Sequence, residues 1–183
     1  VLTADGPPQP VRWAGGRAFD SAALRANPKL RPIHIRKGAL GGGACGQAMP
    51  ARDLFVSPQH RMLVRSKIAW RMFGVTEVLL PALLLTGVPG ISRYSDETPL
   101  AYHHVLFKGH HVIFANGTET ESLFGGEQAL NAVGAAARTE IFAIFPEMRR
   151  MASQTAGARP FVYGPEGRKL VRRHLANDVP LVS

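Results

Sequence analysis

Two side chains in the first half of the chain, Ser57 and His60, have the types and the spacing that proton-transfer chemistry uses. An imidazole changes its charge near neutral pH, so one histidine presented by a loop is a common general acid or base. A hydroxyl three residues earlier can face the same small volume and orient a substrate. The alternative is structural: Ser57 caps the turn, and His60 is a surface or half-buried residue. This short pattern by itself leaves both interpretations open.

The residues around this pair predict a strand, a turn and a second strand. Apolar residues alternate over Leu54–Val56 and again over Arg61–Val64, a pattern that favours strands. Pro58 lies between the two runs and ends the first one, because it has no N–H to give to a ladder. We therefore expect a hairpin whose turn holds His60 between two apolar strands.

A second group of imidazoles lies in the segment Tyr102–Gly117, for which two strands joined by a turn at Lys108-Gly109 are predicted. Neighbouring side chains of a strand point to opposite faces, so one histidine of each adjacent pair faces inward. His104 and His110 could face each other across this expected hairpin. No third ligand stands at a matching position, so we expect no metal and no cofactor.

Composition restricts the classes of partner. The chain has 183 residues, a net charge of +9 and 45% hydrophobic residues, as a globular domain with a sizeable core has. No apolar run reaches the roughly 18 residues that span a membrane. The basic residues form no stripe interleaved with aromatic residues, so we expect a solvated basic surface and no specific nucleic-acid site. The single cysteine, Cys45, excludes an internal disulfide. Oligomeric state and localisation stay open.

The order of predicted elements indicates a mainly β fold. Short strand patterns fill most of residues 1–125, whereas Leu130, Ile141 and Phe145 belong to a stripe of helical period over residues 127–150. A short basic helix is predicted at Glu166–Leu175. We therefore expect a β domain over residues 1–125. A helical extension with a basic tail, residues 126–183, would pack on it through the stripe.

Several stretches carry a resemblance when they are taken in chain order. They are Trp13, Arg31-Pro32-Ile33, Pro50-Ala51-Arg52-Asp53-Leu54, Ser57-Pro58-Gln59-His60, Tyr102-x-His104, and His110 through Ala115-Asn116-Gly117 to Glu121-Ser122. In this combination the chain resembles the Hedgehog/intein (Hint) domains of bacterial proteins. The stretch ending in His60 is similar to the family's Thr-x-x-His block. The resemblance implies a compact, horseshoe-shaped, all-β fold.

The same resemblance implies self-cleavage of a peptide bond. In this family an N-terminal Cys or Ser attacks the carbonyl just before it and converts the peptide into a thioester or an ester. His60 would then donate a proton to the leaving nitrogen, and Ser57 would orient the scissile peptide. His104 stands where many inteins have an aspartate that handles the proton of the nucleophile. The partner of the domain would be its own upstream polypeptide.

Two departures from the family pattern shape the expectation. The family's Cys block precedes the turn at residues 1–6, so we expect the chain as printed to lack its nucleophile and to be inactive. No His-Asn pair closes the domain, and Thr120-Glu121-Ser122-Leu123 stands there instead. We therefore expect cleavage without splicing. The alternatives are a non-catalytic Hint-fold module for binding or secretion, and a basic nucleic-acid-binding domain.

Overall fold

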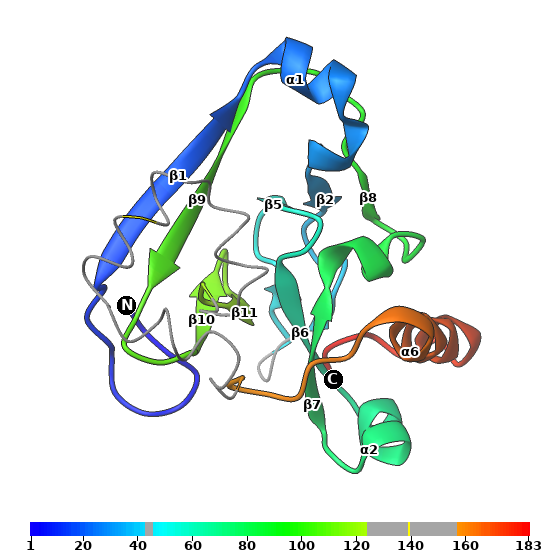
Figure 1. The fold of residues 1–183 in the computed structure, drawn as a ribbon. Helices are drawn as coiled ribbons and strands as arrows, with labels where there is room; N and C mark the ends of the chain where they lie inside the picture. The colour runs from blue at the N-terminus through cyan, green and yellow to red at the C-terminus, as the bar shows by residue number, and fades with distance from the viewer. Residues whose placement is uncertain (43–45, 124–138, 140–156) are drawn as a thin grey trace.

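The computed structural model describes residues 1–42, 46–123, 139 and 157–183, and strands dominate the described part of the chain (Figure 1). The strands are β1 (Trp13–Phe19), β2 (Ile33–Ile35), β3 (Gly41–Gly42), β4 (Ala48–Met49), β5 (Leu54–Val56), β6 (Arg61–Arg65), β7 (Glu77–Pro81), β8 (Ile91–Arg93), β9 (Leu100–Leu106), β10 (Val112–Ala115) and β11 (Thr118–Glu121). The α-helices are α1 (Ser21–Ala26), α2 (Lys67–Phe73) and α6 (Gly164–Ala176), and the 3₁₀-helices are η1 (Pro28–Leu30) and η2 (Ala82–Leu85). The predicted mainly β fold with a short C-terminal helix is confirmed.

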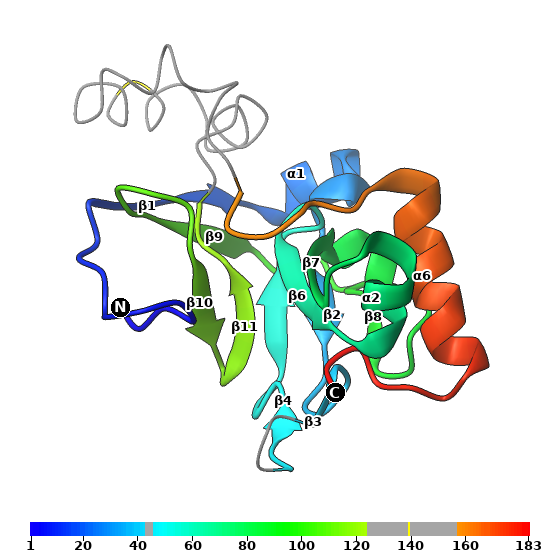
Figure 2. The same cartoon turned by 90° about the horizontal axis from the view of Figure 1, so that it is seen from below.

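The strands form a long ribbon and three further sheets. In the ribbon, β1 and β9 run antiparallel with Trp13 opposite Leu106 at one end and Phe19 opposite Leu100 at the other. A four-stranded sheet has the order β10-β11-β6-β7, a three-stranded sheet the order β5-β2-β8, and β3 pairs with β4. Seen from below, the β10–β11 hairpin lies beside β6, and the N-terminal residues run along β10 (Figure 2).

Both predicted hairpins are wrong in their strand pairing, although their strands exist. β5 pairs with β2, and β6 pairs with β7 and β11. The turn between them is attached to η2 instead, because Ala82 N donates to His60 O at 2.9 Å and Leu83 N donates to Pro58 O at 2.9 Å. The strand that leaves this turn, β6, therefore pairs with β7 and not with β5.

The second hairpin fails for a local reason. β9 pairs with β1, whereas β10 turns back at Asn116-Gly117 and pairs with β11. Asn116 and Gly117 have φ angles of 49° and 78°, and two successive positive values are what a two-residue type I′ turn requires. This tight turn gives β10 a neighbour that is closer in sequence than β9.

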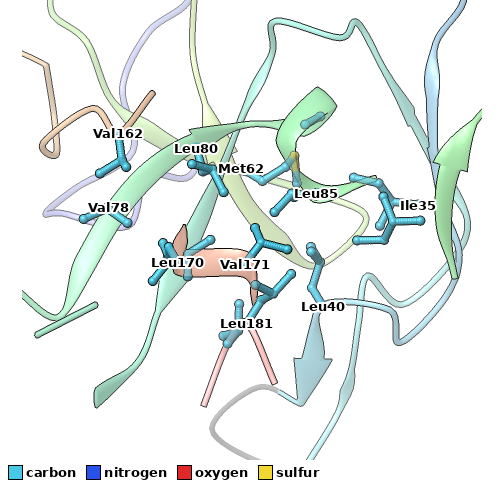
Figure 3. Packing of buried hydrophobic residues seen from close by; sticks show 14 of the residues in the cluster. Ile35, Leu40, Met62, Val78, Leu80, Leu85, Val162, Leu170, Val171 and Leu181 are labelled. Carbon is cyan, nitrogen blue, oxygen red and sulfur yellow. The ribbon is translucent and has the colours of Figure 1, made fainter. Parts of the chain in front are cut away.

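The C-terminal segment completes the main core. Val162, Leu170, Val171, Leu181 and Val182 are buried in one cluster with residues of β2, β6 and β7 (Figure 3). The predicted basic helix is confirmed as α6. The helical stripe expected over residues 127–150, with its packing residues Leu130, Ile141 and Phe145, lies outside the described residues, as does Cys45.

Candidate functional site

A pocket of about 430 Å³ lies where β5, β6, β9 and the β10–β11 hairpin meet, and Ser57, His60 and His104 all line it. The first two residues come from the turn after β5, and His104 comes from β9, where it stands opposite Gly15 of β1. The turn is closed by a hydrogen bond from His60 N to Ser57 O at 3.0 Å. Three residues that the sequence singled out thus surround one volume.

Thr120 of β11 fixes the imidazole of His60. Nε2 of His60 and Oγ1 of Thr120 form a short hydrogen bond, and Thr120 Oγ1 also donates to Arg61 O at 3.0 Å. A hydroxyl has one proton to donate, and here it goes to the carbonyl, so the Nε2–H of His60 is the donor to Thr120. In the neutral ring, Nδ1 is then the basic nitrogen.

Burial lowers the pKa of His60 below its ordinary value, and the charges around the ring act in both directions. The carboxylate of Glu121 raises this pKa, whereas His104, Arg61 and His110 lower it. Burial also lowers the pKa of His104, again opposed by Glu121. Because both pKa values are lowered, both imidazoles are mainly neutral near pH 7, and each protonated ring is a stronger acid than an ordinary imidazolium.

Glu121 is the buried charge of this site. Its carboxylate accepts from Arg61 N at 2.9 Å and from Arg61 Nη1 at 3.1 Å and 2.8 Å, and Nε2 of His110 lies 3.4 Å from its Oε2. Burial by itself would raise the pKa of Glu121, but His110, His60 and Arg61 together lower it. The group is therefore ionised at neutral pH.

His110 does not line the pocket, but its Nε2 faces the carboxylate of Glu121. Its Nδ1 accepts a hydrogen bond from Ala158 N at 2.9 Å. In the neutral ring, the hydrogen must then be on Nε2, the nitrogen that faces the carboxylate.

Tyr102 also lines the pocket, but it is not a proton donor for reactions near neutral pH. Its hydroxyl donates to Leu30 O at 2.6 Å, and burial raises its pKa to about 12, in spite of the opposing charge of Arg93. Tyr102 is accordingly not a candidate proton-transfer group of the pocket.

Sequence reasoning missed Thr120 and Glu121 as parts of the site. A signal was present: Glu119 and Glu121 are two apart on one strand, while Arg61 and Arg65 are four apart on another, so each pair shares a face. In the structure Arg65 bonds Glu119 at 2.5 Å and Arg61 bonds Glu121, side by side. Only the pairing of β6 with β11 shows which arginine binds which glutamate.

Two other kinds of feature, metal-ligand clusters and membrane-spanning helices, are absent from the described residues. Across the parts of the chain that the structure describes, no three His, Cys, Asp or Glu side chains come together as metal ligands would. Within those same residues, no helix combines the length and the apolar character needed to cross a membrane.

The first residues of the chain run beside the pocket wall: Thr3 forms an antiparallel bridge with Ile113, which lines the pocket.

The fold and the pocket together define a β-rich domain in which Ser57, His60, His104 and the buried carboxylate of Glu121, from elements distant in sequence, line one pocket. Comparison with known families matches residues 1–127 to the Hint domain. The chain belongs to the Hint domain family. No curated protein and no solved structure matches the chain.

Proposed function

We propose that this chain is the body of a self-cleaving Hint domain, which moves an upstream acyl group from nitrogen to sulfur or oxygen and does not splice. The observation that supports this most is the meeting of Ser57, His60 and His104 around one pocket. Proton donors and acceptors must lie within hydrogen-bond reach of the reacting atoms, directly or through one water. Because all three residues line one pocket, a peptide held in that pocket could contact each of them.

The reaction is an acyl shift followed by hydrolysis. The thiol or hydroxyl of the nucleophile forms a bond to the carbonyl carbon of the preceding residue, and the carbon–nitrogen bond of that peptide breaks. The nucleophile's proton goes to His104, and the leaving nitrogen receives a proton from His60. Water then breaks the thioester or ester, so the upstream segment leaves with a free carboxylate.

The environment of His60 suits the role of acid. A peptide nitrogen is a poor leaving group unless it is protonated, and burial lowers the pKa of His60, which makes its protonated form a better donor. Thr120 binds Nε2, so Nδ1 is the nitrogen that delivers the proton. Ser57, on the same turn, would orient the scissile peptide by a hydrogen bond to it.

The nucleophile in this proposal is a Cys or Ser carried by residues that precede Val1. The bridge between Thr3 and Ile113 supports such a path, because chain entering along β10 passes the pocket wall. The domain's own upstream polypeptide is then its substrate. The 183 residues alone are expected not to cleave.

The test uses the chain extended at its N-terminus by its natural upstream residues. Intact mass is followed with and without hydroxylamine, which attacks thioesters and esters. Cleavage immediately before the Cys or Ser, faster with hydroxylamine and absent after its change to Ala, is the expected result. An extended chain that folds and stays uncleaved under both conditions would overturn the proposal and favour a non-catalytic module for binding or secretion.

A further inference from the structure

Glu121 is a charged residue of the pocket that has no role yet in the proposed proton transfer. Glu121 lines the same pocket as His60, and its side chain is 7% exposed. We propose that Glu121 is a positioning residue of this site: its carboxylate, fixed beside His60, stabilises the protonated imidazole from which the leaving nitrogen takes its proton. This inference deepens the proposed function and rests on it.

The carboxylate is held from two directions. Arg61 binds it through both its backbone N–H and its guanidinium, a geometry that fixes the position of the group as well as its charge. His110 approaches Oε2, which Arg61 Nη1 also contacts, with Nε2, the nitrogen that bears its hydrogen. A buried carboxylate with these partners stays ionised in one place, as an electrostatic stabiliser must.

The segment 158–163 builds this arrangement, although it lies outside residues 1–127, the part that matches the family. The guanidinium of Arg61 lies 4.5 Å from the centre of the Phe161 ring and 5.3 Å from that of Tyr163, and its Nη2 donates to Tyr163 Oη at 2.9 Å. Ala158 N fixes the tautomer of His110. The C-terminal segment therefore belongs to the site as well as to the core.

Other titratable or charged groups also interact with His60, so the test must distinguish the effect of Glu121 from theirs. The ring interacts with Glu121 of β11, His104 of β9, Arg61 of β6 and His110 of the loop before β10. Of these four groups, only Glu121 carries negative charge. Removing that charge must therefore make His60 harder to protonate, whereas the fixed positive charge of Arg61 acts in the opposite direction.

Glu119 provides a matched control. It lies two residues away on the same strand, is buried to a similar degree, and pairs with Arg65 of β6 as Glu121 pairs with Arg61. Glu119 does not line the pocket. Glu119→Gln and Glu121→Gln thus remove the same charge from equivalent ion pairs, and only the second change should reach His60.

The experiment is an NMR titration of the His60 ring in the 183-residue chain, so it needs no cleavage. Glu121→Gln should shift the titration midpoint of His60 to lower pH, and Glu119→Gln should leave it on the wild-type curve. Equal shifts in both variants, or none in Glu121→Gln, would overturn the inference. In the extended chain, Glu121→Gln is also expected to slow cleavage, because the protonated imidazole that donates to the leaving nitrogen loses its stabilising charge.

A measurement on the unmutated chain covers the case in which Glu121→Gln fails to fold. The carboxyl carbon resonance of Glu121 should move at the pH where His60 titrates, and that of Glu119 should not. A Glu121 resonance that ignores the His60 titration would sink the inference. An extended chain without cleavage, together with positive titrations, would refute the proposed function and leave the charge coupling established.

Discussion

Replacing Thr120 by valine tests whether the His60 ring is held as the structure has it. Valine has the shape of threonine without the hydroxyl, so it removes the short bond to His60 Nε2 and the bond to Arg61 O together. Thr120 is 1% exposed, and water cannot easily replace the hydroxyl. Thr120→Ser keeps the hydroxyl and loses one methyl group, which makes it the matched control.

The expected loss of stability follows from the two groups that lose a hydrogen-bond partner, His60 Nε2 and Arg61 O. An ordinary hydrogen bond contributes about 1 kcal/mol net, and a buried group left unpaired costs about 1–3 kcal/mol. His60 is half-buried, so its share lies at the low end. We expect Thr120→Val to lower the free energy of unfolding by about 2 kcal/mol, which corresponds to a fall in Tm of about 4–8 °C for a chain of this size.

Urea denaturation at pH 7.5 measures the unfolding free energy of the wild-type chain and both variants. Thr120→Ser should stay within about 1 kcal/mol of wild type, because only a buried methyl is lost. If Thr120→Val is as stable as wild type, or if serine costs as much as valine, the two hydrogen bonds do not hold the ring.

Three other perturbations have definite expected outcomes. Burial lowers the pKa of His174 and outweighs the two backbone carbonyls that accept from its Nδ1. The unfolded chain therefore binds more protons than the folded chain as the pH falls through about 6.5. The free energy of unfolding, measured by urea titration, should fall between pH 7.5 and 5.5, and it should fall less in His174→Gln. Gly117→Ala should cost about 1–2 kcal/mol in the same assay, because φ is +78° there. Phe161→Leu keeps an apolar side chain but removes the ring beneath Arg61, and calorimetry should show a loss of about 1 kcal/mol; an unchanged Tm would contradict the stacking.

What the sequence predicted correctly was determined by neighbours along the chain. Alternation and Pro58 located β5 and the turn that carries Ser57 and His60. Each of these signals lies within a few residues of the structure it specifies, so no knowledge of the fold was needed.

What the sequence left out depends on contacts between distant elements. The pairing of β6 with β11 brings Thr120 to His60 and Arg61 to Glu121, about 60 positions away, and no local pattern encodes it. The first hairpin prediction failed for the same reason: β5 and β6 had several possible partners, and hydrogen bonds to other elements made the choice. The aromatic rings that support Arg61 come from still farther along the chain.

The central claim is that His60 donates the proton that releases the upstream segment, and the cleavage rate of the extended chain tests it most directly. General acid catalysis contributes about 10²–10⁴-fold, so His60→Ala should slow cleavage by at least about a hundredfold while the circular dichroism spectrum stays that of the parent. His104→Ala should slow it less, because water can partly replace a proton acceptor. Cleavage of His60→Ala at the parent rate would contradict the account.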